Sequence, residues 1–186
     1  MSISPIYQGC TIVFDLDGTL IDTAPDLAAA LNHVMDSIGR PHLPPATVRG
    51  LVGHGARALI ERGLATHGLQ TSEAELQALL ARFLGFYGEN IATRSKPFPG
   101  VATTLAHLRA RQARLGVCTN KPAALSHKLF AALGMGAEFE ALLGGDSLPV
   151  KKPDPAHVIE TIRQAGGDPA RAVMVGDSAA DIDSAK

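Results

Sequence analysis

An apolar segment near the start of the chain ends in two aspartates that are one residue apart. Ile12-Val13-Phe14 runs into Asp15-Leu16-Asp17-Gly18-Thr19. Successive strand residues point to opposite faces, so Asp15 and Asp17 share a side if strand geometry continues, and Gly18 permits a sharp turn. Two carboxylates at one place repel each other unless a metal ion or a shared proton relieves them. The pair suits Mg²⁺-assisted attack by one carboxylate on phosphorus while the other moves a proton, although an isolated Asp-Gly pair is also a common turn.

Three later segments also carry groups that suit this chemistry. Thr119-Asn120-Lys121-Pro122 offers a hydroxyl and backbone N–H groups before a helix, which fits a phosphate-binding site or an ordinary helix cap. Lys151-Lys152-Pro153-Asp154-Pro155 offers either a fixed cation beside a phosphoryl group or a surface lysine pair. Gly176-Asp177-Ser178, with Asp181 one helical turn later, offers carboxylates that suit Mg²⁺ or a helix cap.

Short apolar runs precede three of these segments and are predicted to be buried strands. The four predicted strands span residues 10–14, 114–118, 141–143 and 172–175. Amphipathic helical patterns separate the last three, which predicts a doubly wound (Rossmann-like) parallel sheet of the α/β class. Because the carboxyl ends of parallel strands lie along one edge, we expect Asp15, Thr119 and Asp177 to converge there.

The connection between the first two predicted strands is too long for one crossover helix. Roughly 98 residues separate Asp15 from Arg114. Helical spacing from Leu27 to Ile38 and a capping-box pattern at Ser72-Glu73-Ala74-Glu75 predict helices in this connection. We therefore predict an all-helical cap over residues 19–95.

The remaining segments, residues 1–18 and 96–186, are predicted to form the α/β core around that cap. The chain ends soon after Asp181, one or two turns into a predicted helix. We therefore expect the C-terminal strand or strands of the sheet to be missing, which leaves the edge of the last strand bare.

Composition argues against several classes of partner. The formal net charge is −1, and the Lys and Arg residues are scattered, which is not the pattern of a nucleic-acid-binding or membrane-binding surface. No apolar stretch approaches the roughly 20 residues of a membrane span. Cys10 and Cys118 lie far apart, which favours two thiols in a reducing compartment. We expect a cytoplasmic protein, as a monomer or a homodimer.

In this order and at these spacings, the four segments resemble the motifs of the haloacid dehalogenase-like hydrolase superfamily, and the helical insertion resembles its type-1 cap. The resemblance covers the whole chain, and its first and fourth motifs are the specific ones. It implies that Asp15 is the nucleophile, forming an aspartyl-phosphate, and that Asp17 is the general acid and then the base. Thr119 would bind phosphoryl oxygens, and Lys152, directly before proline, would steady the nucleophile and the phosphate.

The resemblance also implies Mg²⁺ as the cofactor. Asp15, Asp177 and the backbone carbonyl of Asp17 would hold the ion. Asp181 would act through a water molecule, or by contacting the ligands and not the ion itself. Gly18 and Asn120 are then expected, with Thr119 and Lys152, to contact the substrate.

Finer features favour one branch of the superfamily. The second aspartate, Asp17, argues against dehalogenation of haloacids. The segments Thr119-Asn120-Lys121-Pro122 and Leu51–Arg57 look most like those of phosphoglycolate phosphatases. This resemblance implies hydrolysis of a small phosphate monoester, 2-phosphoglycolate, to glycolate.

The cap segment also contains candidate substrate contacts. Gly53 and Gly55 would let a cap loop approach the substrate closely. Arg49, His54 and Arg57 would then offer donors to a second anionic group such as a carboxylate. The other interpretation is a helix-linking turn with solvent-facing arginines.

Other functions remain open at this point. A sugar-phosphate mutase resembling β-phosphoglucomutase carries the same four motifs. A non-catalytic phosphate-binding module would keep the scaffold without turnover. A phospho-acceptor receiver also uses acidic residues, Thr and Lys at strand ends, but the long insertion after the first strand argues against it.

Overall fold

The computed structural model describes residues 9–186, and the fold that follows is that of this part of the chain. Its main sheet has four parallel strands in the order β5-β4-β1-β6. Their bounds are β1 (Thr11–Phe14), β4 (Arg114–Cys118), β5 (Ala141–Leu143) and β6 (Ala172–Val175). All four predicted strands are present, which confirms the predicted doubly wound parallel α/β sheet.

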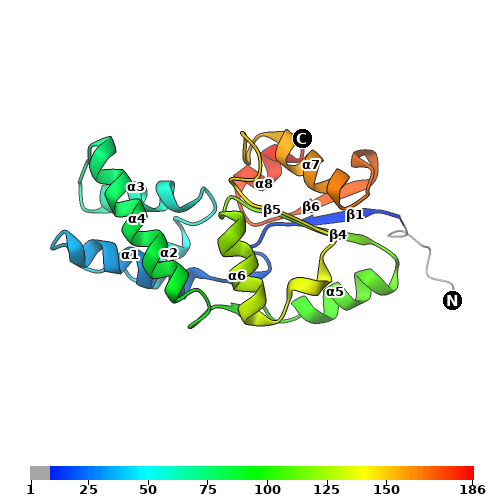
Figure 1. Cartoon of the computed structure of the whole chain (residues 1–186), viewed down its shortest axis with the longest axis horizontal. Coiled ribbons are helices and arrows are strands. Elements are labelled where there is room, and N and C mark those ends of the chain that lie inside the picture. Colours follow the sequence, from blue (N-terminus) through cyan, green and yellow to red (C-terminus); the bar gives the residue numbers. More distant parts are fainter. Residues whose placement is uncertain (1–8) are drawn as a thin grey trace.

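Helices cover both faces of this sheet (Figure 1). They are α5 (Val101–Ala110) and α6 (Ala123–Leu133) on one side, and α7 (Pro155–Gln164) and α8 (Ala179–Ser184) on the other. Strand β1 shows the alternation that this layering requires. Phe14 belongs to the same apolar cluster as Phe130 of α6, whereas Val13 packs with Val158 and Ile162 of α7.

Four of the five helices between β1 and β4 pack on one another, away from the sheet (Figure 1). They are α1 (Ala24–Ser37), α2 (Pro45–Arg49), α3 (Ala56–Thr66) and α4 (Glu73–Glu89). The helical spacing from Leu27 to Ile38 lies in α1 and the loop after it, and the predicted capping box of Ser72 and Glu75 opens α4. The short helix α2 begins at Pro45, which suits the first position of a helix because proline has no N–H to leave unpaired.

Two short strands join the two ends of the helical segment to the sheet. β2 (Ile21–Asp22) pairs antiparallel with β3 (Lys96–Pro97). Beside them the buried carboxylate of Asp26 accepts hydrogen bonds of 3.0, 2.8 and 2.7 Å from Arg94 N–H, Ser95 N–H and the Ser95 hydroxyl. The outgoing and returning chains are thus tied together at the base of the helical segment.

Glycine, aspartate and proline bound the helices in the second half of the chain. Gly134 ends α6 with a left-handed φ of 69°. The side chain of Asp154 caps α7, with Pro155 at its first position. Two single-turn 3₁₀ helices complete the connections, at Gly136–Glu138 and Pro169–Arg171.

The last strand departs from the prediction of a buried strand. Within the described residues β6 is an edge strand that pairs only with β1, and Val173 and Val175 are 53% and 38% exposed. The bare edge expected from the sequence is therefore present.

The structure also bears on the two cysteines and on membrane-spanning helices. Cys10 precedes β1 and Cys118 ends the neighbouring parallel strand, so no disulfide joins them. Within residues 9–186, no helix combines the length and the apolar character that a membrane crossing would need.

Candidate active site

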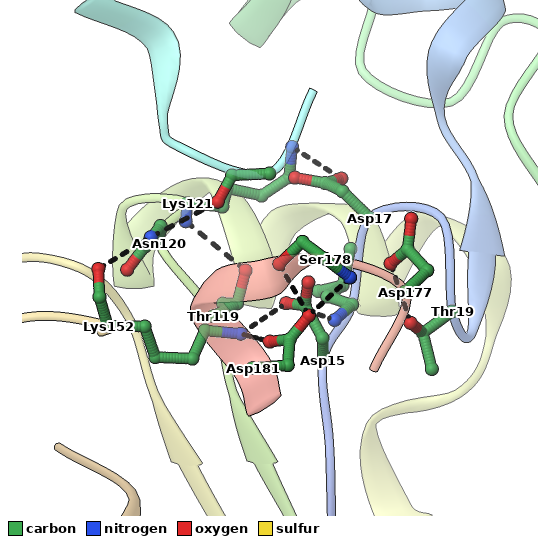
Figure 2. A network of polar contacts seen from close by, with 12 residues as sticks. Asp15, Asp17, Thr19, Thr119, Asn120, Lys121, Lys152, Asp177, Ser178 and Asp181 are labelled. Atoms are coloured by element: carbon green, nitrogen blue, oxygen red, sulfur yellow. Dashed lines mark hydrogen bonds and ion pairs between the residues drawn. The ribbon is translucent and has the colours of Figure 1, made fainter. Parts of the chain in front are cut away.

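Polar side chains converge at the carboxyl edge of the sheet, as the order of strands and motifs predicts (Figure 2). Asp15 directly follows β1, Thr119 directly follows β4, and Asp177 lies two residues after the end of β6. Lys152 reaches the same place from the loop before α7, and Asp181 reaches it from α8. Segments that are far apart in the sequence thus meet at one site.

Asp15 is buried and has one oxygen anchored and one open. Its Oδ1 accepts a 2.7 Å hydrogen bond from the N–H of Leu16 and lies 3.0 Å from Nζ of Lys152. Its Oδ2 takes part in none of the hydrogen bonds of the described residues. Burial raises the pKa of Asp15 to about 7 in the metal-free protein; Lys152 opposes this rise and the charge of Asp181 adds to it. The open oxygen is placed to attack an electrophile.

Lys152 joins two carboxylates in a dry environment. Its ammonium lies 2.6 Å from Oδ1 of Asp181 as well as 3.0 Å from Asp15 (Figure 2). Burial alone would lower the pKa of Lys152, but the two carboxylates outweigh it and hold the pKa above its ordinary value. Lys151 is exposed, so the geometry agrees with the choice of Lys152 over its neighbour.

A cluster of three carboxylates suits a divalent cation. Asp15, Asp177 and Asp181 each offer an oxygen, and these oxygens lie within 4.8 Å of one another. Hard oxygen ligands are those that Mg²⁺ prefers, and a cation would relieve the repulsion between these carboxylates. The residues present therefore fit the ion. Asp181 lies inside this cluster, while the carboxylate of Asp17 does not belong to it.

The loops that carry the cluster are fixed by contacts of their own. The hydroxyl of Thr19 donates a 2.8 Å hydrogen bond to Asp177. Gly18 has a φ of 88°, and a Cβ at this position would collide with the Asp177 carboxylate. Oδ2 of Asp181 accepts hydrogen bonds of 2.9 and 2.6 Å from the N–H and hydroxyl of Ser178.

The Thr119 segment faces the same site from β4. Oγ of Thr119, which is buried, accepts a 3.2 Å hydrogen bond from the N–H of Lys121, and its own hydroxyl proton is left to donate. The side-chain amide of Asn120 donates to the carbonyls of Gly53 and Lys152, at 3.2 and 3.1 Å. Asn120 thus ties the helical segment to the lysine loop.

Of the candidate residues in the helical segment, the glycines come closest to the site. A Cβ added at Gly53 would lie 3.2 Å from Cβ of Ser178, and one added at Gly55 would lie 3.3 Å from the carbonyl oxygen of Asn120. Both glycines have φ values in the left-handed region, 108° and 88°, so another residue would be strained there.

The candidate donors Arg49, His54 and Arg57 are instead engaged with other residues. Arg57 binds both oxygens of Glu73 at 2.7 Å, and Arg49 pairs with Asp22 at 2.8 Å. Nδ1 of His54 lies 3.1 Å from the guanidinium of Arg62. None of the three lines the pocket at the site.

A pocket between the helical segment and the sheet opens onto Asp15 and Asp17. Only about 30 Å³ of its space can be reached by the centre of a water molecule. Thr119, Asn120, Lys121 and Tyr87 of α4 supply its other polar groups. The remaining lining is glycine and apolar side chains, so the pocket suits a small ligand.

The family model for haloacid dehalogenase-like hydrolase matches residues 11–186. The chain belongs to this family.

Relatives of this haloacid dehalogenase-like hydrolase carry a more specific name. Phosphoglycolate phosphatase of Caulobacter vibrioides is 48% identical over 181 residues, which are 97% of this chain and 76% of the relative. Phosphoglycolate phosphatase of Mesorhizobium japonicum is 49% identical over 175 residues, covering 94% and 77% of the two chains. The crystal structure of a predicted phosphoglycolate phosphatase from Haemophilus somnus is 35% identical, covers 94% of this chain and 80% of that one, and has a TM-score of 0.85. The chain is an enzyme of the phosphoric monoester hydrolase class.

Two residues of the pocket were not singled out from the sequence as site residues. Nζ of Lys121 lies 3.0 Å from Oδ1 of Asp17 and donates a 2.8 Å hydrogen bond to the hydroxyl of Tyr87. The position of Lys121 between Thr119-Asn120 and Pro122 was the available signal. Nothing in the sequence relates Tyr87, at the end of α4, to that segment.

Proposed function

We propose that this hydrolase is a Mg²⁺-dependent phosphatase that converts 2-phosphoglycolate to glycolate through an aspartyl-phosphate on Asp15. One observation carries the proposal. Oδ1 of Asp15 is anchored by Lys152 and Leu16, Oδ2 has no hydrogen bond among the described residues, and Asp15 lines the pocket beside a carboxylate cluster. Such an arrangement is what in-line attack on phosphorus requires.

In the first half of the reaction, Oδ2 of Asp15 attacks phosphorus and the bond to the ester oxygen breaks. Asp17, which lines the same pocket, gives its proton to that leaving oxygen. The Thr119 hydroxyl and the Lys152 ammonium donate to the phosphoryl oxygens. When bound by Asp15, Asp177 and the backbone carbonyl of Asp17, Mg²⁺ would supply positive charge that offsets the charge on those oxygens.

In the second half, water attacks the phosphorus of the aspartyl-phosphate. Asp17, now ionised, takes a proton from that water, and inorganic phosphate leaves as the Asp15 carboxylate is regenerated. The cap must open between the halves to admit water, and the contact between Asn120 and Gly53 would break in that motion. Asp181 holds Lys152 in place throughout.

The choice of substrate rests on the relatives and on the pocket. The named relatives are phosphoglycolate phosphatases, at 48% and 49% identity. The pocket lies against Asp15 and Asp17 and has Thr119, Asn120 and Lys121 in its wall, which suits a small anionic ester. The proposal includes a cap of residues 19–95 and a core of residues 1–18 and 96–186, of which residues 1–8 lie outside the described part of the chain. It also includes a small-molecule substrate with no nucleic-acid or membrane partner, and a cytoplasmic location.

Phosphate release from a panel of esters tests the proposal. We expect 2-phosphoglycolate to be hydrolysed in the presence of Mg²⁺ with the highest kcat/KM of the panel, and chelation by EDTA to stop release. The panel includes glucose 1-phosphate with a sugar bisphosphate activator. Conversion of that sugar phosphate to an isomer without phosphate release would contradict the proposal and identify a mutase.

A further inference from the structure

Lys121 is a buried cation that the phosphoryl chemistry proposed above does not use. Only 5% of its surface is exposed, and its ammonium lies 3.0 Å from Asp17, 2.8 Å from the Tyr87 hydroxyl and 4.4 Å from the centre of the Tyr87 ring. Burial alone would lower the pKa of Lys121, but Asp17 and Tyr87 outweigh it and hold the pKa above its ordinary value. The pocket therefore has a fixed positive charge in its wall.

Two hydrogen-bond donors remain at this place after the contacts of the described residues are counted. A lysine ammonium has three N–H groups; that of Lys121 donates one hydrogen bond, to Tyr87, and forms an ion pair with Asp17, so one N–H remains even when both contacts are counted. The Tyr87 hydroxyl accepts from Lys121, and its own proton has no acceptor among the described residues. Burial raises the pKa of Tyr87 to about 12, so the phenol keeps that proton at neutral pH.

Apolar side chains form the rest of the wall around these donors. Leu27, Leu59, Phe83, Leu84 and Leu125 line the same pocket. A buried donor without an acceptor is costly, and an anionic group bound here would accept from both donors at once. The surrounding apolar surface favours an anion carried on a short carbon chain.

The position of Asp17 indicates which part of a substrate reaches this place. Under the proposed function, Asp17 protonates the ester oxygen, so the atoms bonded to that oxygen lie beside the Asp17 carboxylate. Lys121 lies 3.0 Å from the same carboxylate, on the side of α4. A group one carbon away from the ester oxygen therefore meets the ammonium and the phenol.

We propose that Lys121 of the core and Tyr87 of the cap together bind the carboxylate of a 2-phosphocarboxylate substrate, and so select it over uncharged phosphate esters. This inference rests on the proposed function. Because one donor comes from each side of the pocket, the carboxylate also holds the cap against the core. Arg49, His54 and Arg57, which have partners elsewhere, are not needed for this recognition.

A pair of matched esters tests the assignment. 2-Phosphoglycolate and ethyl phosphate differ at one carbon, which is a carboxylate in the first and a methyl group in the second. The measured quantity is the ratio of kcat/KM for the two esters, compared between variants so that their different intrinsic reactivities cancel. We expect this ratio to fall about 100-fold in Lys121→Met and about 10-fold in Tyr87→Phe. Lys128→Met, which removes an exposed lysine from α6, the helix that follows Lys121, is the control and keeps the ratio.

Two results would overturn the assignment. Equal losses on both esters in Lys121→Met would show that Lys121 acts only on Asp17, and an unchanged ratio in both variants would show that neither residue meets the carboxylate. Tyr87→Phe, a conservative change, decides the matter if Lys121→Met does not fold.

A binding measurement distinguishes failure of this inference from failure of the proposed function. Titration calorimetry with 2-phosphoglycolate in an Asp15→Asn background needs no turnover. Wild-type protein that hydrolyses neither ester would contradict the proposed function. Weaker binding on adding Lys121→Met, but not on adding Lys128→Met, would still support the carboxylate site, and equal binding would refute it.

Discussion

The ammonium of Lys152 lies 2.6 Å from a carboxylate oxygen of Asp181, and both side chains are almost fully buried. The pair joins the loop before α7 to the helix that follows the last strand. Because a second buried carboxyl group, Asp15, lies 3.0 Å from the same ammonium, Lys152 is the cationic partner of two acidic side chains. Such charges are strongly destabilising when their partner is removed.

Replacement of Lys152 is therefore expected to affect stability as well as turnover. We expect Lys152→Met to lower the free energy of unfolding by about 3–5 kcal/mol in metal-free protein, because Asp15 and Asp181 would stay buried without a cation. Urea denaturation measures this change. Lys151→Met is the matched control, since Lys151 is exposed, and its effect should stay within about 0.5 kcal/mol. Equal effects of the two changes would contradict the buried charge cluster.

Most of the sheet could be predicted because strands buried on both faces are continuous apolar runs bounded by turn residues. The last strand shows the limit of that signal. Its sequence Ala172-Val173-Met174-Val175 is as apolar as a central strand, yet Val173 and Val175 are exposed at the sheet edge. The strands β2 and β3 have two residues each, and such short elements arise from tertiary pairing, not from a sequence pattern.

The candidate site also contains residues that could be predicted from the sequence and residues that could not. Asp15, Thr119 and Asp177 could be placed because each lies just beyond a strand end, where topology alone brings them together. Contacts between residues on opposite sides of the pocket could not be predicted from the sequence. The contact of Lys121 with Tyr87 depends on how α4 packs, and Arg57 turns to Glu73 because that carboxylate is close on the surface.

Asp15 is expected to be indispensable for turnover and dispensable for folding. We expect Asp15→Asn to lower kcat by about four orders of magnitude or more, because the amide is a poor nucleophile toward phosphorus. The fold should persist, since Lys152 keeps its 2.6 Å contact with Asp181. Phosphate release and circular dichroism measure the two effects. Substantial turnover by the folded variant would remove Asp15 from the mechanism.

Asp26 is expected to hold the base of the helical segment together. Asp26→Ala would leave the N–H groups of Arg94 and Ser95 without their acceptor, at a cost of about 1.5–3 kcal/mol in the free energy of unfolding. Asp36→Ala removes an exposed carboxylate from the same helix and serves as the control. Urea denaturation and hydrogen exchange at Ser95 would report the change. Protection of that amide as strong as in the wild type would contradict the role of Asp26.

His157 is expected to make stability depend on pH on the acid side of neutrality. Its imidazole is fully buried, with Nε2 3.0 Å from the carbonyl oxygen of Gly144. Burial lowers the pKa of His157 from its ordinary value of 6.5; the hydrogen bond to Gly144 opposes this and the charge of Lys152 adds to it. As the pH falls below 6.5, the unfolded chain therefore takes up a proton that the folded protein does not.

The contribution of His157 is thus complete above about pH 6.5 and is lost as the pH falls toward its lowered pKa, with a slope of at most about 1.4 kcal/mol per pH unit. His157→Gln removes the titrating group, so the free energy of unfolding should change less between pH 7.5 and 5.5 than in the wild type, even though the variant is less stable at pH 7.5. The measurement is urea denaturation at several pH values. His127→Gln, at an exposed position of α6, should keep the wild-type slope. If His157→Gln also kept that slope, the acid sensitivity would have to come from other groups.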